Sequence, residues 1–380
     1  MRRNGRITAY IHMDAIAENF EHMRANLREG TQMVAVLKTD GYGHGALPIA
    51  RMAEEYEYIW GFAVAAVSEA MELRAGGITK PILILGYCFE EDYEKMVSSG
   101  IRPAVFTYEM AKAFSDAAGK AGILAPVHIA VDTGMSRIGL PWTDEGVETA
   151  QRISRLPHIR TEGVFTHFAK ADETDKSFTK MQMDRFVQFC DGLQERVTER
   201  FIRHCSNSAG ILEIPEANMD MVRAGISIYG IYPSGEVSRA YVRLRPAMEL
   251  KSHIVHIKTI EPGTSVSYGG TFTAQRRTRI ATIPVGYGDG YPRSLSGKGF
   301  VLIGGKRAPI TGRVCMDQFM VDVTDIEAGL LDEVTLLGSD GDEQITLEEL
   351  DKLSGRFPYE FVCDIGKRVP RVYSREQRAK

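Results

Sequence analysis

The stretch MVAVLKTDGYGHGA, residues 33–46, joins an apolar run to a loop that contains three glycines, a tyrosine and a histidine. The run is typical of a buried β-strand, and it stops at Lys38. Burying an ammonium group costs free energy unless the charge is paired, neutralised or used in chemistry. We therefore expect Lys38 to lie at the end of a strand and to have a function there.

The same pattern recurs along the first part of the chain. Apolar runs of strand length alternate with segments whose apolar residues are three and four apart, up to about residue 226. The runs are residues 34–38, 60–65, 81–86, 102–107, 126–133, 161–168, 203–207 and 221–226. Continuous apolar strands separated by helices predict a parallel sheet that is covered on both faces, and eight of them predict a (β/α)8 TIM barrel. A doubly wound open sheet is the alternative that this pattern leaves open.

The pattern changes after about residue 240. β-branched runs broken by Gly and Pro follow, and only residues 346–355 resemble a helix. A chain of 380 residues is long enough for two hydrophobic cores. We therefore predict an α/β plus β protein, with the barrel in residues 1–240 and a mostly-β domain in residues 241–380.

Composition narrows the class of partner and the compartment. The net charge of -4 gives no reason to expect a nucleic acid, so we expect a small-molecule partner. The five cysteines are scattered and form no CxxC pair, which argues against a disulfide framework or a structural zinc site and favours a reducing cytoplasm. The basic N-terminus passes directly into an alternating and then amphipathic pattern, and no apolar run reaches membrane-spanning length. We expect neither a signal peptide nor a contact with a membrane.

The active site of a barrel lies at the C-terminal ends of its strands, where the apolar runs stop. The residues at these stops are Lys38, Tyr42, Asp132, Arg137, His167, Ser206 to Ser208, Arg223, Gly225 and Ile226. A lysine in a partly dry place has a lowered pKa and can form a Schiff base with an aldehyde. Backbone N–H groups with Ser and Tyr hydroxyls can hold a phosphate. Together these features suggest pyridoxal phosphate.

Each feature taken alone has a simpler explanation. Lys38 could be a solvated or ion-paired strand end, and His167 could be a packed histidine. The loop GYGHG lacks the spacing of a dinucleotide-binding or P-loop motif. His253 and His256 are three residues apart on a predicted strand, so they point to opposite faces and predict no metal site. Only the combination of strand-end residues predicts a functional site.

Ten motifs carry a resemblance to a known family. They are VLKTDGYGHG, VDTGMSRIG, THFAKADE, NSA, VRAGISIYG, SYGGTF, VGYGDGYPR, GRVCMDQFMVD, YEF and RVPRVY. In this order, and across essentially the whole chain, they resemble bacterial alanine racemases, which are pyridoxal-phosphate enzymes of fold type III. The resemblance implies a TIM barrel followed by a β domain, a head-to-tail homodimer with shared active sites, and the interconversion of L- and D-alanine, which supplies D-alanine for peptidoglycan.

The resemblance also assigns roles to residues. Lys38 matches the lysine that binds the cofactor and serves as one catalytic base, and Tyr268, contributed by the partner subunit, matches the second base. Racemisation needs one group on each face of the reacting carbon, one to remove the proton and one to return it. Because the ordinary pKa of tyrosine is about 10, neighbouring positive charge must lower it. Arg223 matches the residue that faces the pyridine nitrogen, which it leaves unprotonated, so that racemisation is favoured over transamination.

The remaining matches concern binding. The residues matched to cofactor contacts are Lys38, Tyr42, Arg137, His167, Ser208, Arg223, Gly225, Ile226 and Tyr359. Those matched to the substrate site are Arg137, Tyr287, Met316 and Asp317, the last three in motifs that come from the second subunit. No metal is implied.

The chain departs from the family pattern beside Arg137. Many members have a lysine, often carbamylated, where this chain has Ala130, so Arg137 lacks its usual carboxylate-like neighbour. Either another anion such as chloride fills the gap or Arg137 is held more loosely. Phe165 also stands where some members have a tyrosine.

Three other functions remain open. A serine or broad-specificity racemase could use the same scaffold, although the retained Tyr359 favours alanine. A pyridoxal-phosphate carrier would lack the β domain and Tyr268. An amino-acid decarboxylase would need phosphate-loop and acid residues that the C-terminal half does not contain.

Overall fold

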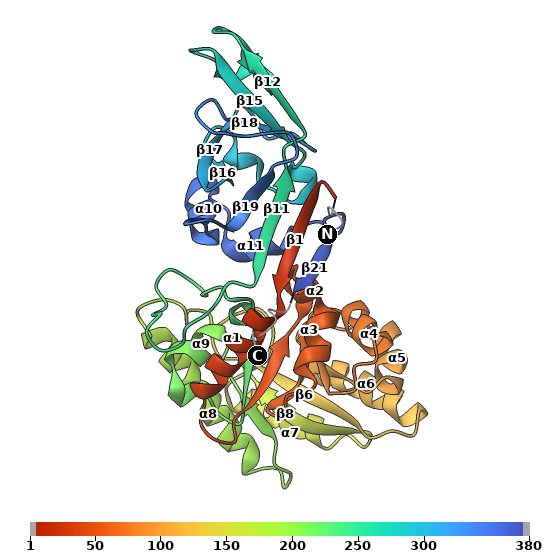
Figure 1. The fold of residues 1–380 in the computed structure, drawn as a ribbon. Coiled ribbons are helices and arrows are strands. Elements are labelled where there is room, and N and C mark those ends of the chain that lie inside the picture. The colour runs from red at the N-terminus through yellow and green to blue at the C-terminus, as the bar shows by residue number, and fades with distance from the viewer. Residues whose placement is uncertain (1–4, 375–380) are drawn as a thin grey trace, which may run out of the picture. The chain divides into compact units, whose positions relative to one another are not determined.

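The computed structural model describes residues 5–374, which form two compact units. Residues 15–41 and 45–245 form the first unit, which we call the barrel unit. Residues 5–14, 42–44 and 246–374 form the second, which we call the β unit. Both units are drawn in Figure 1.

Eight parallel strands make the sheet of the barrel unit. They are β2 (Gln32–Val36), β3 (Ile59–Val64), β4 (Ile82–Ile84), β5 (Ile101–Val105), β6 (Ala125–Asp132), β8 (Ile159–Phe165), β9 (Ile202–His204) and β10 (Met221–Ala224). Their order is β10-β2-β3-β4-β5-β6-β8-β9, and the short β7 (Leu140–Pro141) pairs with β6. The N–H of Arg223 in β10 bonds the carbonyl oxygen of Ser206, just after β9, at 3.0 Å, so the two ends of the sheet meet. The predicted eight-stranded barrel is confirmed, and the open sheet is excluded.

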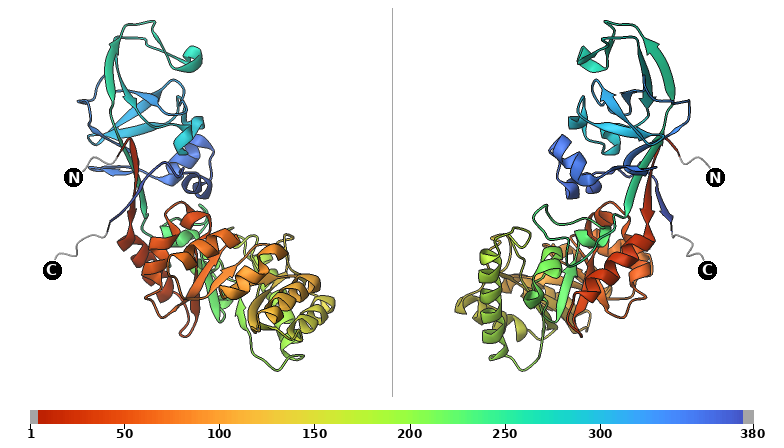
Figure 2. Two further views of the ribbon diagram at one scale, coloured as in Figure 1. Left: turned by 90° about the vertical axis from the view of Figure 1, so that its right-hand side faces the viewer. Right: turned by 60° about the vertical axis from the view of Figure 1, so that its left-hand side comes forward.

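Helices cover the outside of these strands (Figures 1 and 2). They are α1 (Met13–Ala25), α3 (Ala46–Ala53), α4 (Val67–Ala75), α5 (Tyr93–Ser98), α6 (Tyr108–Lys120), α7 (Asp144–Ser154), α8 (Ser177–Gln194) and α9 (Ser208–Glu213). Side-chain caps define several starts: the hydroxyl of Thr107 accepts the N–H of Met110 in α6, and the amide oxygen of Asn207 accepts the N–H of Gly210 in α9. Because the strands are apolar on both faces and the helices on one, the core lies between them.

The β unit is built on a ten-stranded sheet. Its strands are β1 (Ile7–His12), β11 (Met248–His253), β12 (His256–Ile260), β15 (Thr278–Ile283), β16 (Phe300–Ile303), β17 (Lys306–Thr311), β18 (Phe319–Asp322), β19 (Glu333–Asp340), β20 (Glu343–Ile345) and β21 (Arg371–Ser374). A separate hairpin joins β13 (Ser265–Val266) to β14 (Phe272–Thr273). Two helices, α10 (Leu347–Ser354) and α11 (Pro358–Cys363), complete it, so a mostly-β second domain is confirmed.

The limits of the two units differ from the expected division at residue 240. Strand β1 lies in the β unit, where Ala9 pairs with Leu250 of β11 and with Arg371 of β21. The edge strands of the barrel already bond each other, whereas β1 completes the sheet between β11 and β21. Strand β1 therefore belongs to the same unit as residues 246–374, although it comes first in the sequence. The last boundary between the units along the chain falls after Arg245.

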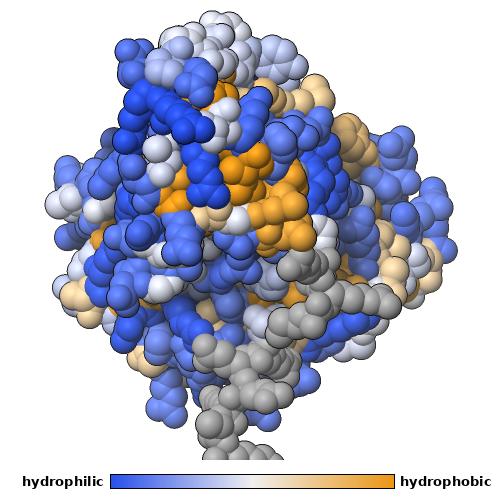
Figure 3. Space-filling view, turned by 45° about the horizontal axis from the view of Figure 1, so that its top comes forward, coloured by the Kyte–Doolittle hydropathy of each residue, from blue (hydrophilic) through white to orange (hydrophobic). Residues whose placement is uncertain are grey.

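Within residues 5–374 there is no helix long and apolar enough to cross a membrane. The face of the molecule in Figure 3 is mostly hydrophilic, with a patch of hydrophobic residues near its middle.

Candidate active site

Lys38 begins an unusual turn. Helix α2 (Lys38–Tyr42) follows β2, and its residues Thr39, Asp40 and Gly41 have left-handed backbone angles, with φ of 54°, 50° and 62°. Tyr42 also has a positive φ of 50°. Left-handed conformation is unfavourable for residues other than glycine, so neighbouring groups must hold this turn.

Glu69 of α4 is one such group. Its Oε1 accepts the N–H of Thr39 at 2.5 Å, and its Oε2 accepts the N–H groups of Ala65 and Ala66 at 2.8 and 3.1 Å. On the other side of the turn, Oδ1 of Asp40 accepts the N–H that begins α3 at 2.8 Å. One carboxylate thus ties the loop after β2 to the loop after β3.

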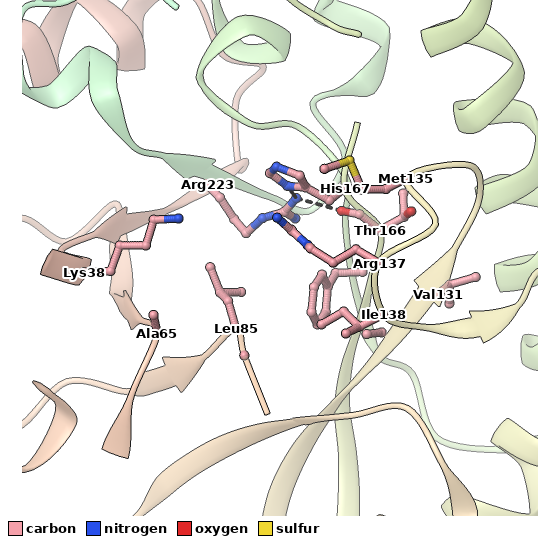
Figure 4. A pocket seen from close by; sticks show the side chains of 13 residues that line it. Lys38, Ala65, Leu85, Val131, Met135, Arg137, Ile138, Thr166, His167 and Arg223 are labelled. Atoms are coloured by element: carbon pink, nitrogen blue, oxygen red, sulfur yellow. Dashed lines mark hydrogen bonds between the residues drawn. The ribbon is translucent and has the colours of Figure 1, made fainter. Parts of the chain in front are cut away.

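Four of the expected residues line one cavity of about 300 Å³ in the barrel unit. In Figure 4 the side chains of Lys38, Arg137 and His167 point toward the space beside Arg223. The lining residues are Lys38, Ala65, Leu85, Gly86, Ala130, Val131, Met135, Arg137, Ile138, Phe165, Thr166, His167 and Arg223. Residues that were selected because they lie near the ends of predicted strands, and that are far apart in the sequence, therefore line one cavity.

Arg223 is 2% exposed, and its guanidinium is held from two sides. One terminal nitrogen donates to Nδ1 of His204 at 3.1 Å and to the carbonyl oxygen of the same residue at 2.8 Å. The other donates to the carbonyl oxygens of Thr166 and Cys205 at 2.7 and 3.1 Å, and Nδ1 of His167 lies 3.4 Å from it. Among residues 5–374, none accepts a hydrogen bond from Nε. The guanidinium is thus fixed with one N–H donor left over.

Burial determines the protonation states of Arg223 and His167 in this cavity. Burial lowers the pKa of Arg223 to about 10, which leaves the guanidinium protonated at neutral pH. Burial lowers the pKa of His167 to about 3, and the positive charges of Arg223, Arg137 and Lys38 act in the same direction. The imidazole of His167 is therefore neutral beside three cationic groups.

A buried row of polar side chains begins behind Arg223. Nε2 of His204 lies 2.9 Å from Nδ1 of His128, and Nε2 of His128 lies 3.3 Å from Oε2 of Glu162. Burial lowers the pKa of both histidines, that of His204 well below its usual value. Burial alone would raise the pKa of Glu162, but hydrogen bonds from His128 and Arg102 outweigh it and lower the pKa to about 2. Below, His128, His167 and His204 are called the barrel histidines.

The expected phosphate contacts fall into two groups. In the barrel unit, the hydroxyl of Ser208 accepts the N–H of Gly225 at 3.0 Å, beside Ile226. In the β unit, the rings of Tyr42 and Tyr359 meet edge to face with centroids 6.2 Å apart. Burial raises the pKa of Tyr42 further above its usual value, so this hydroxyl stays protonated.

The expected second base and substrate residues lie in the β unit. Tyr268 is 70% exposed and follows Ser267, whose φ is 65°. Tyr287 and Met316 lie in neighbouring loops, because the N–H of Tyr287 bonds the carbonyl oxygen of Cys315 at 3.1 Å. Asp317, next to Met316, is paired with a guanidinium.

The surroundings of Ala130 are apolar. It packs with Phe165 and Ala104 in one buried cluster, against which Leu85 also lies. Arg137 is exposed, and within the described part of the chain no side chain or backbone group forms a hydrogen bond or ion pair with it. The structure thus places no protein carboxylate where the family pattern has its lysine.

Four residues were missed by the sequence analysis: Glu69, His128, Glu162 and His204. His128 and Glu162 interrupt the apolar runs of PVHIAVD and TEGVF, and His204 ends the short strand IRH with its side chain fully buried. A polar residue inside a buried strand needs a partner, and that signal alone could have marked them. Glu69 carries no such signal, because it lies on a partly exposed helix position.

Comparison with known proteins gives a consistent result. Residues 11–233 match the sequence profile of the alanine racemase N-terminal domain, and residues 247–373 match that of its C-terminal domain. The chain is 44% identical to an alanine racemase of Clostridium tetani over 97% of its own length and 96% of that protein. It is 45% identical to an alanine racemase of Desulforamulus reducens over 97% of its own length and 98% of that protein.

Solved structures agree with these matches. An alanine racemase of Clostridium difficile superposes with a TM-score of 0.93 at 41% identity, covering 97% of this chain and 96% of that one. An alanine racemase of Bacillus anthracis, solved with bound L-Ala-P, superposes with a TM-score of 0.90 at 35% identity over 97% of this chain and 95% of that one. The family resemblance of the motifs is confirmed. The chain therefore belongs to the alanine racemase family and is an isomerase.

Proposed function

We propose that the chain interconverts L- and D-alanine with bound pyridoxal phosphate, using Lys38 and Tyr268 of the partner subunit as the two bases. The observation that carries the proposal is the cavity in which Lys38, Arg137, His167 and Arg223 meet. It combines an amine, two guanidiniums and a neutral imidazole at the C-terminal ends of barrel strands, where barrel enzymes have their active sites.

The donors that the chain offers fit the parts of pyridoxal phosphate. Lys38 supplies an amine for an aldehyde carbon, and the remaining N–H of Arg223 supplies one donor for a ring nitrogen. In the barrel unit, the hydroxyl of Ser208, which accepts the N–H of Gly225, and the backbone N–H of Ile226 supply neutral donors for a phosphate. Tyr42 and Tyr359, whose rings meet in the β unit, are proposed as two further phenolic donors. When bound, the cofactor withdraws electrons from the α-carbon of the amino acid and makes its proton removable.

Two bases explain how one site can work in both directions. The amine of Lys38 removes or returns the α-proton on one face, while the hydroxyl of Tyr268 of the partner subunit does so on the other. Tyr268 is 70% exposed in its own chain, and Tyr287 and Met316 are also exposed. Large exposed side chains of this kind support burial against a second copy. We infer a head-to-tail homodimer in which the β unit of one subunit completes the barrel site of the other.

Arg223 and His167 determine the charge and the hydrogen-bond donors beside the ring nitrogen of the cofactor. A guanidinium stays protonated, so Arg223 can donate a hydrogen bond to a ring nitrogen but does not give up its proton. The neutral His167 adds no further positive charge beside it. This favours return of the proton to the α-carbon over its transfer to the cofactor.

Substrate size and charge support alanine. The guanidinium of Arg137 is exposed at the cavity and suits a carboxylate, with Tyr287, Met316 and Asp317 of a second subunit completing that side. The apolar lining at Ala130 and Leu85 and the retained Tyr359 favour a methyl over a hydroxymethyl group. We further infer a cytoplasmic enzyme that supplies D-alanine for peptidoglycan, which complementation of a D-alanine auxotroph would test.

The decisive experiment offers L-alanine and L-serine side by side to the cofactor-loaded protein in D2O. Chiral chromatography with mass detection measures both inversion and uptake of deuterium at the α-carbon. Fast inversion of alanine with little inversion of serine is expected. Comparable or faster turnover of serine would replace the proposal by a broad-specificity racemase, and no deuterium uptake despite bound cofactor would favour a carrier protein.

Mixing two inactive variants tests the shared site. Lys38→Ala and Tyr268→Phe each remove one base, so each homodimer should be inactive. If Tyr268 serves the partner's site, half of the randomly re-formed dimers contain one intact site, and about a quarter of the wild-type activity returns. No recovery after verified subunit exchange would show that both bases come from one chain.

A further inference from the structure

The row of side chains behind Arg223 has a donor at one end and an acceptor at the other. A guanidinium has only N–H donors, and an ionised carboxylate has only acceptors. Between Arg223 and Glu162 lie the rings of His204 and His128, joined by hydrogen-bond distances of 3.1, 2.9 and 3.3 Å. The order of these groups determines where each proton must be.

While the guanidinium of Arg223 keeps the orientation seen in the structure, Nδ1 of His204 accepts from it, so the proton of His204 is on Nε2. That Nε2–H then donates to Nδ1 of His128, whose own proton must in turn be on Nε2. The Nε2–H of His128 donates to Oε2 of Glu162. Starting from Glu162 gives the same assignment in reverse, and protonation of either ring would place two donors face to face.

The surroundings hold this row in place. Both histidines are fully buried, and His204 stacks on Phe165 with centroids 5.1 Å apart. A Cβ at position 163 would come within 2.5 Å of the ring of His128, so Gly163 leaves the room that this ring occupies. The edge of His128 also meets Trp60. The ring of His128 therefore occupies a space that a side chain at position 163 would fill.

Glu162 is held as a carboxylate at the far end. Nε of Arg102 donates to Oε2 at 2.8 Å, and a terminal nitrogen of Arg160 donates to Oε1 at 3.0 Å. A terminal nitrogen of Arg102 also donates to Oε1 at 3.4 Å. Of the four lone-pair directions of a carboxylate, these three bonds leave one, which is taken by Nε2 of His128.

We propose that Glu162 is a positioning residue of the active site, which fixes both histidines as Nε2–H tautomers so that His204 always presents a lone pair to Arg223. Through this row the carboxylate keeps the guanidinium of Arg223 in one orientation, with Nε free for the ligand. This role rests on the proposed function of Arg223 in binding the cofactor ring.

The tautomers can be observed directly, without turnover. Histidine labelled with 15N in the full-length protein, with and without pyridoxal phosphate, distinguishes the Nε2–H, Nδ1–H and protonated forms by their two-bond 15N–1H correlations. We expect His128 and His204 to be neutral Nε2–H tautomers in both samples. An Nδ1–H or protonated form of either ring in the wild type would overturn the proposal.

Two variants test the dependence on Glu162. Glu162→Leu removes the acceptor, and His128→Asn breaks the row while leaving the ion pairs of Glu162 with Arg102 and Arg160 intact. In both, Nδ1–H signal from His204 should appear, and kcat should fall roughly tenfold with a smaller change in KM, the effect of one lost hydrogen bond. Glu94→Gln, which removes an exposed carboxylate paired with Lys120, is the matched control and should change neither.

Failure of this inference is distinguishable from failure of the proposed function. If His204 keeps its Nε2–H tautomer in folded His128→Asn protein, Glu162 does not set it, whatever the activity. If the wild-type protein does not racemise alanine but the tautomers respond as expected, the row operates and the proposed function is wrong.

Discussion

Replacing Glu69 by alanine should loosen the turn that carries Lys38. The carboxylate of Glu69 accepts three backbone N–H groups, those of Thr39, Ala65 and Ala66, at 2.5, 2.8 and 3.1 Å. Alanine has no acceptor, so the N–H of Thr39 would lose its link to the neighbouring loop. Because the left-handed turn begins directly after Lys38, the lysine amine should then be positioned less often at the cavity.

The magnitude follows from two opposing quantities. The turn keeps Thr39, Asp40 and Tyr42 at positive φ, which costs about 1–2 kcal/mol per residue. A hydrogen bond to a carboxylate contributes about 1.5–3 kcal/mol, and less at exposed positions such as Thr39, Ala65 and Ala66, where water replaces it. A net loss of about 2 kcal/mol lowers the ratio of formed to open turn by roughly 30-fold, and the apparent affinity for pyridoxal phosphate falls by up to that factor.

Cofactor affinity is measured by absorbance titration of cofactor-free protein, and the turn itself by hydrogen exchange of the Thr39 amide. Glu72→Ala is the matched control, because Glu72 lies on the same helix, is exposed and makes no side-chain hydrogen bond within residues 5–374. We expect weaker binding and faster exchange in Glu69→Ala only. Unchanged affinity and unchanged exchange in Glu69→Ala would refute the reasoning.

Three further predictions concern the barrel unit. Arg223→Glu should raise the formation of pyruvate relative to racemisation, because a carboxylate allows the ring nitrogen to hold a proton; an unchanged ratio by product analysis would contradict this. Replacing chloride by gluconate should leave the KM for alanine unchanged, because the apolar surroundings of Ala130 offer a chloride only Arg137; a rise of more than about threefold would show that the anion fills the gap. Folding lowers the pKa values of the barrel histidines, so below about pH 6.5 the unfolded chain binds more protons than the folded chain. The free energy of unfolding should therefore fall as the pH drops below about 6.5, by up to about 1.4 kcal/mol per pH unit for each histidine. Urea unfolding of cofactor-free protein at fixed concentration at pH 7, 6 and 5 measures this slope, and stability that is flat or rises toward pH 5 would be the wrong sign.

Local pattern was enough to predict the elements of the barrel. Each of its strands is a continuous apolar run and each following helix has its own periodicity, so both can be recognised within a few residues. Lys38, Arg137, His167 and Arg223 could be predicted as a group because all lie near or after the C-terminal ends of strands of one barrel. The roles of the bases in the β unit came from motif resemblance, since no periodicity marks Tyr268.

Contacts between distant residues were decided only by the tertiary structure. The first strand alternates like any half-buried strand, but its sequence does not say that Ala9 pairs with Leu250. His128 and His204 are 76 positions apart, and Glu69 reaches Thr39 across 30 positions. Strand identity is a property of a short segment, whereas a hydrogen bond between buried side chains depends on the register and curvature of the whole sheet. The sequence by itself therefore determined the elements and the strand-end residues, and the fold determined which polar groups meet behind them.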